Sequence, residues 1–311
     1  MKCAFLFPGQ GSQYPGMLQD LPKHPQVFAV IEEASRILSV DITQFDHAEA
    51  LKSTVAVQLA LLICGVATAS VLITEGTAPD MVAGHSLGAF AAAVIAGVIE
   101  FKDALRLVKQ RGEWMEQAYP CGYGMGIVLG MDERTLTAIV ERVTTADAPV
   151  FLANRNAPDQ IAVSGSLSSL EKLLDTARMA GARKTMLLNV GVPSHSPLMK
   201  DVSDQLAKAM EVVPFTDPRI PYGGIYKART LFTAAEIRND LAISTSAPVR
   251  WHEITTLFYE KGVRLFVEMQ PGDVLTDLAT NAFPEARAMS ISKSGVPSAV
   301  ILSKRMKEKW L

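Results

Sequence analysis

The sequence predicts an α/β fold in which a large domain built on a parallel sheet is interrupted by a smaller domain. Two short and mainly apolar segments, 2–7 and 80–83, each run directly into a glycine-rich turn, as strands of a parallel sheet do. Between about residues 124 and 192 the apolar periodicity instead switches between strand and helix in the order βαββαβ. Together these observations predict two sheets of different kinds in one chain.

The large domain is predicted to comprise residues 1–123 and 193–311. An apolar run at 55–68 predicts a buried helix, because it is shorter than the roughly 20 residues that cross a bilayer and Gln58 interrupts it. A hydrolase-like parallel core is expected from the strands Lys2–Phe7, Asp80–Ala83 and Leu265–Glu268 and from helices around Val55 and Ala89.

The smaller domain is predicted to cover residues 124–192. Its first helix carries Asp132 and Glu133 in the first turn, where the helix dipole favours acidic side chains. The βαββαβ order is that of a ferredoxin-like domain. Gly, Pro and Asp punctuation divides the segment into a strand at 126–129, a helix at 132–143, strands at 150–153 and 160–163, a helix at 169–179 and a strand at 185–190.

The segment Gly84-His85-Ser86-Leu87-Gly88 matches the Gly-x-Ser-x-Gly pattern of a nucleophile elbow. A strand that turns sharply into a helix brings its backbones too close for a Cβ at the flanking glycines. Ser86 is therefore the candidate nucleophile, at the positive end of a helix expected to run to about Ile99. The five-residue pattern alone also arises by chance in unrelated chains.

A second glycine-rich turn, Pro8-Gly9-Gln10-Gly11, follows the first predicted strand. On its own, this segment fits an ordinary strand-end turn as well as it fits a loop of a functional site. Acyl transfer at a serine, however, needs two hydrogen-bond donors for the oxyanion. One is commonly the N–H of the residue after the nucleophile, and the other comes from a nearby strand-end loop. The backbone N–H groups of Leu87 and Gln10 fit those two places.

A serine nucleophile needs a base to take its proton, and the chain has 5 histidines. His24 and His47 lie in polar, loop-like surroundings that favour surface positions, and His252 lies at a predicted helix start. His85 adjoins the serine, and we expect it to shape the site rather than act as the base. His195 remains, in a loop fixed by two prolines. From the residues alone it is equally consistent with a structural histidine.

Several motifs occur in a fixed order along the chain: Phe7–Gln13, Gly84–Gly88, Gln110–Gly112, the pattern Asn154-x-Asn156-x-Pro158-x-Gln160, and Val192–His195. Near the C-terminus they are followed by Pro248–Trp251 and Val267–Leu275. In this order the motifs resemble the malonyl-CoA:acyl carrier protein transacylase family. The resemblance runs nearly from end to end of the chain.

The resemblance implies a Ser–His dyad and ping-pong acyl transfer, with Ser86 as the acylated nucleophile and His195 as general base and then general acid. It implies that a backbone carbonyl near Ser244, rather than a carboxylate, orients the histidine. It also implies that Arg111 grips the free carboxylate of the malonyl group, to which a planar, permanently charged guanidinium is suited. From spacing alone, Arg111 is a solvated helix residue.

The same resemblance implies that two further side chains are candidate site residues. Gln58 aligns with a glutamine that lines the family's site, although the proline that usually follows it is Leu59 here. Met115 lies one helical turn after Arg111 and is a candidate wall of the acyl pocket. A helix-surface amide and plain core packing are the alternatives at these two positions. The expected substrate is malonyl-CoA and the acceptor a carrier protein's phosphopantetheine-type arm, with no bound cofactor and no metal.

Other segments resemble the epsilon subunit of malonate decarboxylase: Leu21–Pro25, Leu51–Leu59, Gly88–Val94 and Gln117–Met125. This narrower resemblance implies a carrier subunit with a phosphoribosyl-dephospho-CoA arm as acceptor, and other decarboxylase subunits as partners. One alternative is the malonyl-CoA:acyl carrier protein transacylase of fatty-acid or polyketide synthesis. The others are a serine thioesterase or hydrolase, and a non-catalytic subunit that only docks a carrier protein.

The composition excludes several other classes of protein. A formal net charge of −2, with no Lys/Arg stripe and interleaved aromatics, argues against nucleic-acid binding. The 3 cysteines are odd in number and far apart, which gives neither a disulfide framework nor a zinc site. The N-terminus has no signal-peptide pattern and the apolar runs are short, so we expect a cytoplasmic protein without a membrane span. A chain of 311 residues that is 49% hydrophobic can bury a sizeable core.

Overall fold

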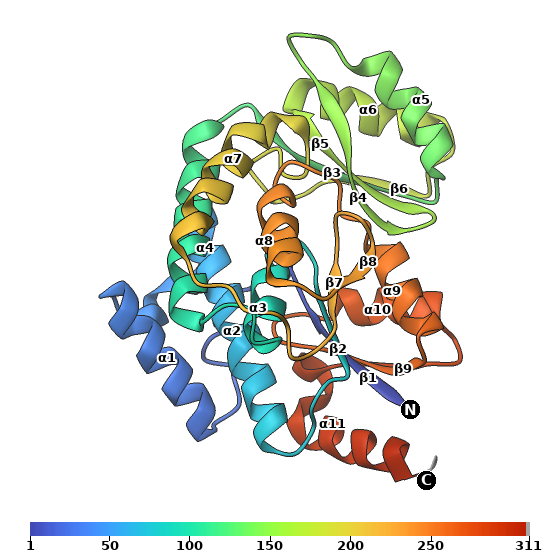
Figure 1. Cartoon of the computed structure of the whole chain (residues 1–311). Coiled ribbons are helices and arrows are strands. Elements are labelled where there is room, and N and C mark those ends of the chain that lie inside the picture. Colours follow the sequence, from blue (N-terminus) through green and yellow to red (C-terminus); the bar gives the residue numbers. More distant parts are fainter. Residues whose placement is uncertain (309–311) are drawn as a thin grey trace.

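The computed structural model describes residues 1–308 and contains two β-sheets with their covering helices (Figure 1). The larger sheet has six strands in the order β10-β9-β1-β2-β7-β8, and the smaller sheet has four in the order β4-β5-β3-β6. In Figure 1 the smaller sheet, with helices α5 and α6, stands at the top of the view on the rest of the chain. The predicted fold class, a parallel-sheet domain interrupted by a smaller α/β domain, is confirmed.

The larger sheet is parallel except at one edge, where β8 pairs antiparallel with β7. Its strands are β1 Lys2–Phe7, β2 Met81–Gly84, β7 Tyr222–Gly224, β8 Arg229–Leu231, β9 Val263–Glu268 and β10 Arg287–Ser290. Phe7 and Gly84 are register partners at the ends of β1 and β2. Because neighbouring parallel strands end at the same edge, the two glycine-rich turns that follow them lie side by side.

The helices of the large domain include α3, which packs against β1 and β2. It ends at Ile95, so the expectation that it reaches Ile99 is wrong. Gly97 has a φ of 75°, and the N–H of Val98 bonds back to the carbonyl of Ala93, which closes the helix. The helices are α1 Pro25–Leu38, α2 Thr54–Thr74, α3 Gly88–Ile95, α4 Phe101–Ala118, α7 Lys200–Ala209, α8 Ala234–Ile243, α9 Trp251–Glu260, α10 Val274–Ala282 and α11 Ile291–Glu308.

Helix α2 is longer than its apolar core predicted. It has 21 residues and a mean hydropathy of 2.3 over its most apolar window, which meets the length and composition of a membrane span. The expectation that the apolar runs are too short to cross a bilayer is therefore wrong. Within the protein, however, 89% of its most apolar window is buried, where it packs against α1, α3 and α4. The interpretation of this segment as a buried core helix is confirmed, and Gln58 is fully buried within it.

The smaller sheet follows the predicted βαββαβ order. Its last strand ends at Leu187 rather than Val190, because the N–H of Val190 turns back to the carbonyl of Leu188. The sheet begins at Tyr123, and the domain boundaries placed at 124 and 192 stay a prediction. The elements are β3 Tyr123–Leu129, α5 Glu133–Val143, β4 Val150–Ala157, β5 Gln160–Ser166, α6 Leu167–Met179 and β6 Lys184–Leu187.

Alternate residues of β3 divide the core of the small domain in two. Val128 packs with Leu136 of α5 and Leu170 of α6. Ile127 lies on the other face, in a cluster that includes Met115 from α4 of the large domain. Successive side chains of a strand point to opposite faces, which produces this division. One face of the small sheet is therefore covered by its own helices, and the other face packs toward the large domain.

Candidate active site

Ser86 lies at the sharp turn between β2 and α3, with a φ of 52°. A Cβ on Gly84 would lie 1.9 Å from the carbonyl carbon of Gly88, and one on Gly88 would lie 2.1 Å from the carbonyl oxygen of Phe7. Both positions therefore require glycine. The N–H of His85 donates to the carbonyl of Phe7 at 2.9 Å, which holds the turn against the end of β1. This local geometry is that of a nucleophile elbow.

His195 is brought to Ser86 from a segment 109 residues away. Its Nε2 atom lies 2.7 Å from the Ser86 Oγ, and its Nδ1 lies 2.6 Å from the carbonyl oxygen of Ser244. A carbonyl only accepts, so Nδ1 carries the ring proton and donates it to Ser244. Nε2 is thereby left to accept from the serine hydroxyl. Both side chains are largely removed from solvent, since Ser86 is 9% and His195 is 2% exposed.

The surroundings of His195 keep its imidazole neutral. Burial, which has the largest effect, together with the positive charge of Arg111 and the nearby His85, lowers its pKa to about 3. The carbonyl of Ser244 opposes this effect by favouring the charged ring. At neutral pH the ring therefore has a free lone pair directed at the serine hydroxyl, which is the state that a general base requires.

Arg111 lies on α4 and is only 2% exposed, so the interpretation as a solvated helix residue is wrong. Burial lowers its pKa to about 10, which leaves the guanidinium charged at neutral pH. Its Nε atom has no hydrogen-bond partner among residues 1–308. A buried guanidinium with an unused donor is an energetically costly group, and an anionic ligand would offset that cost.

Gln58 and Met115 meet each other inside the fold. The amide Nε2 of Gln58 donates to the Met115 Sδ at 3.4 Å, and the Gln58 Oε1 is buried without a partner within the described chain. The alternative of a helix-surface amide for Gln58 is therefore excluded. Met115 lies on the same helix as Arg111, one turn further on. The side chains of Gln58 and Met115 thus form a polar contact beside an otherwise apolar core.

Two backbone donors are available at the elbow. A Cβ on Gly9 would lie 2.5 Å from the carbonyl oxygen of His85, so the loop after β1 rests directly on the elbow. Among residues 1–308, no backbone hydrogen bond uses the N–H of Gln10 or of Leu87. Leu87 is the N-cap of α3, where the first N–H groups of a helix are free. Both N–H groups therefore remain free to bind an oxyanion.

His85 joins the elbow to the small domain, a contact that sequence reasoning missed. Its Nε2 lies 3.0 Å from the Oδ1 of Asn156 on β4, and its ring packs edge-on against Trp251 at 5.4 Å between centroids. Burial lowers the pKa of His85. A neutral ring must carry its proton on Nε2 to donate to this oxygen. The alternation of Asn154 and Asn156 on one strand was the available signal.

A cavity of about 310 Å³ lies between the two domains. Gln10 and His85 border it on the side of the large domain, and Asn156, Lys184 and Met186 border it on the side of the small domain. Its apolar lining comes from both domains: Ile127, Leu129, Ala162 and Leu188 from the small domain, and Val274, Leu275 and Leu278 from α10. Because His85 of the elbow is part of its lining, the cavity provides a route to the elbow.

The comparisons with known proteins agree on one family. Residues 4–309 match the acyl transferase domain. The chain is 35% identical over 296 residues to the malonyl CoA-acyl carrier protein transacylase of Bacillus subtilis, covering 94% of this chain and 93% of that one.

Two solved structures are similar over their whole length. The transacylase of Coxiella burnetii superposes with a TM-score of 0.91 at 32% identity, covering 98% of this chain and 96% of that one. A malonyl-transacylase in complex with its type II PKS acyl-carrier protein superposes with a TM-score of 0.92 at 36% identity, covering 97% and 100%. The chain is therefore an acyltransferase and belongs to the malonyl-CoA:acyl carrier protein transacylase family.

Proposed function

We propose that this protein transfers a malonyl group from malonyl-CoA to the thiol of an acyl carrier protein through a malonyl ester on Ser86. The observation that carries this proposal is the buried guanidinium of Arg111 close to the Ser86–His195 pair. A serine and a histidine alone serve any acyl group, whereas a buried cation with an unused donor selects an acyl group that ends in a carboxylate.

The reaction runs in two similar halves. The Ser86 Oγ attacks the thioester carbonyl while the His195 Nε2 takes its proton, and the carbonyl becomes a tetrahedral oxyanion bound by the N–H groups of Gln10 and Leu87. When the oxyanion collapses, the C–S bond breaks and the leaving sulfur takes the proton from His195. A carrier thiol then attacks the serine ester by the same steps, with His195 first as base and then as acid.

One backbone carbonyl and four side chains prepare the site for this chemistry. The Ser244 carbonyl fixes the ring of His195 in the tautomer whose Nε2 accepts the serine proton. Arg111 binds the free malonyl carboxylate, while Gln58 and Met115 line the acyl pocket beside it. His85 shapes the turn by its contact with the small domain.

Intact-protein mass spectrometry after mixing with malonyl-CoA tests the proposal. The wild-type protein should gain one malonyl group, and Ser86→Ala should gain none. Labelling of another residue, or no labelling, would overturn the proposal. Thiol release without any acceptor separates transfer from hydrolysis. A burst of about one equivalent favours a transferase, whereas continued release at a similar rate favours the thioesterase alternative.

The acceptor is a separate question. The transacylase bound to a type II PKS acyl-carrier protein favours a carrier of that kind, as do the relatives named as acyl carrier protein transacylases. The malonate decarboxylase carrier rests on sequence segments such as Gly88–Val94, in which Ala89 and Phe90 are fully buried. Such positions report on core packing rather than on a docking surface.

Transfer to the two carriers, measured side by side, decides between the acceptors. We expect malonylation of the acyl carrier protein, as observed by its gain in mass. A strong preference for the malonate decarboxylase carrier would instead assign the chain to that complex, with the decarboxylase subunits as partners.

A further inference from the structure

We propose that Arg155 is a positioning residue for acyl transfer. It lies where β4 of the small domain meets the large domain, and we call this contact region between the two domains the seam. With Glu133, Arg250 and Glu253 it fixes β4 on the large domain, so that Asn156 reaches His85 beside the nucleophile. We call these four charged residues the seam cluster. The inference rests on the proposed malonyl transfer at Ser86.

Strand β4 presents different side chains to the two sides of the seam. Asn154 and Asn156 border the cavity that leads to the elbow. Arg155, between them, borders a second cavity of about 540 Å³, which the other members of the seam cluster also line. The pairing of β4 with β5 is irregular on both sides of this segment. Such bulges re-aim side chains near active sites, so the orientation of Asn156 depends on what holds this segment.

The backbone of β4 is bonded to the large domain at this point. The N–H of Arg155 donates to the carbonyl of Val249 at 2.8 Å, and the N–H of Val249 donates to the carbonyl of Ala153 at 2.9 Å. Arg250 in turn donates its N–H to the carbonyl of Ile225, beside β7 of the large sheet. The edge of the small sheet is thereby tied to the segment that leads into α9.

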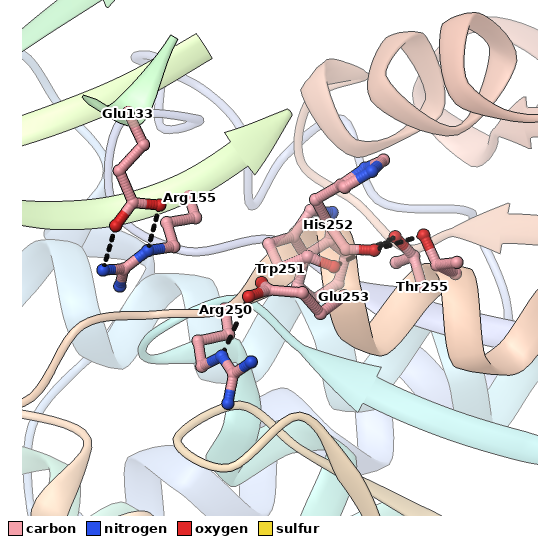
Figure 2. Close-up of polar contacts among 8 residues, drawn as sticks. Glu133, Arg155, Arg250, Trp251, His252, Glu253 and Thr255 are labelled. Atoms are coloured by element: carbon pink, nitrogen blue, oxygen red, sulfur yellow. Dashed lines mark hydrogen bonds and ion pairs between the residues drawn. The ribbon is translucent and has the colours of Figure 1, made fainter. Parts of the chain in front are cut away.

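The side chains of the seam cluster form two ion pairs, one in each domain (Figure 2). In the small domain the Nε and Nη2 of Arg155 donate to the two carboxylate oxygens of Glu133 at 2.7 and 2.5 Å. In the large domain the Nε of Arg250 donates to Glu253 at 2.9 Å. The second oxygen of Glu253 is buried without a partner among the described residues.

The two pairs attract each other across the seam. The hydrogen bond with Glu133 raises the pKa of Arg155, and the charge of Glu253 raises it further. The hydrogen bond with Arg155 lowers the pKa of Glu133, and the charge of Arg250 lowers it further. Charges of alternating sign thus run from one domain into the other, which favours one relative placement of the domains.

This placement reaches the nucleophile through one hydrogen bond. The Oδ1 of Asn156 lies 3.0 Å from the Nε2 of His85, and His85 immediately precedes Ser86. The His85 ring also packs against Trp251, which follows Arg250 in the chain. Displacements of about 1 Å at a reacting group can cost two orders of magnitude in rate, so a small shift of β4 has a measurable effect.

Exchanging the charges of one pair separates positioning from local stability. In the double variant Glu133→Arg with Arg155→Glu, the pair inside the small domain is kept, but each member now faces a like charge across the seam. We expect about a tenfold loss of kcat/KM for malonyl transfer both in this variant and in Arg155→Met. Adding Arg250→Glu and Glu253→Arg restores opposite charges across the seam and should return most of the activity.

The control is Arg178→Met, which breaks the Arg178–Asp175 pair on α6 of the same domain, away from the seam. It should keep wild-type kinetics, and thermal unfolding of every variant identifies any that fails to fold. Full activity in the charge-exchanged double variant, or no recovery in the fourfold variant, would overturn the inference.

A readout without turnover keeps the test independent of the proposed function. In wild-type protein, ¹⁵N NMR of the His85 ring should show the proton on Nε2, as its bond to Asn156 requires. In Arg155→Met the signal should shift toward a mixture of the two tautomers. An unchanged His85 spectrum would contradict the positioning role, whereas absence of a Ser86 acyl-enzyme in the wild type would contradict only the proposed function.

Discussion

The Nε2 of His195 lies 2.7 Å from the Oγ of Ser86, and both residues have a backbone in the left-handed region, with φ of 62° and 52°. Non-glycine residues rarely adopt this conformation, and they keep it only where the surroundings enforce it. For Ser86 the surroundings are the close backbone contacts at Gly84 and Gly88, which leave no room for a Cβ. For His195 they are the bond from its N–H to the Thr245 carbonyl and the bond from its ring to Ser244.

The rate of Ser86 acylation should not show the ordinary titration of a histidine. Because the pKa of His195 is lowered to about 3 from 6.5, the base stays neutral over the usual working range. We expect kcat/KM to stay nearly constant from about pH 8 to about pH 5. Stopped-flow thiol release across this range provides the measurement. A decline with a midpoint near 6.5 would show that the buried ring titrates normally.

The same shift predicts a loss of stability in acid. Between the folded pKa of about 3 and the unfolded value of 6.5, the unfolded chain binds more protons at His195. Stability should therefore fall as pH falls through this window, by about 1.4 kcal/mol per pH unit. Asp240, whose pKa burial raises to about 6, acts in the opposite direction.

Comparison with His195→Gln isolates this contribution, because Asp240 is common to both proteins. Urea unfolding at several pH values gives the two slopes. The variant should lose less stability than the wild type in acid, and equal slopes would contradict the prediction.

Arg111→Ala should separate malonyl from acetyl transfer. Truncating one partner of a buried charge pair typically costs about 2–5 kcal/mol, so malonyl transfer should fall by about 100-fold. Acetyl transfer, which offers no carboxylate, should be unchanged or improved. Lys109→Ala, on the exposed face of the same helix, is the control. An undiminished rate of malonyl transfer would remove Arg111 from the site.

Gly88→Ala should prevent the elbow from forming. Its added Cβ would lie 2.1 Å from the Phe7 carbonyl oxygen, a backbone atom that cannot move without displacing β1. We expect a large drop in melting temperature or loss of soluble protein. Gly191→Ala is the matched control, since a Cβ there meets nothing within 4 Å. Similar melting temperatures for the two variants would contradict the steric argument.

The elbow was predictable because it depends on local sequence, whereas the local sequence around His195 fits a structural histidine equally well and only the family resemblance selects it as the candidate base. Ser86 lies between two glycines, and His195 lies between two prolines. The burial of Arg111 was not predictable from spacing, since α4 is amphipathic and only tertiary packing decides which of its side chains are enclosed. The contact of Asn156 with His85 and the seam cluster around Arg155 depend on bulged pairing and on how the domains meet. The alternation of Asn154 and Asn156 places both on one face of a strand, but no local pattern indicates which residues of the other domain that face meets.

The oxyanion assignment at Gln10 concerns a backbone group, and this makes it testable by two substitutions of opposite outcome. Gln10→Ala keeps the N–H and should retain kcat within about threefold, because the side chain is not used. Gln10→Pro removes the N–H and should lower kcat by about 100- to 1,000-fold, the usual cost of losing one such donor. KM for malonyl-CoA and the melting temperature should remain near wild-type values in both variants. Equal rates for the two variants would place the second oxyanion donor elsewhere in the loop after β1.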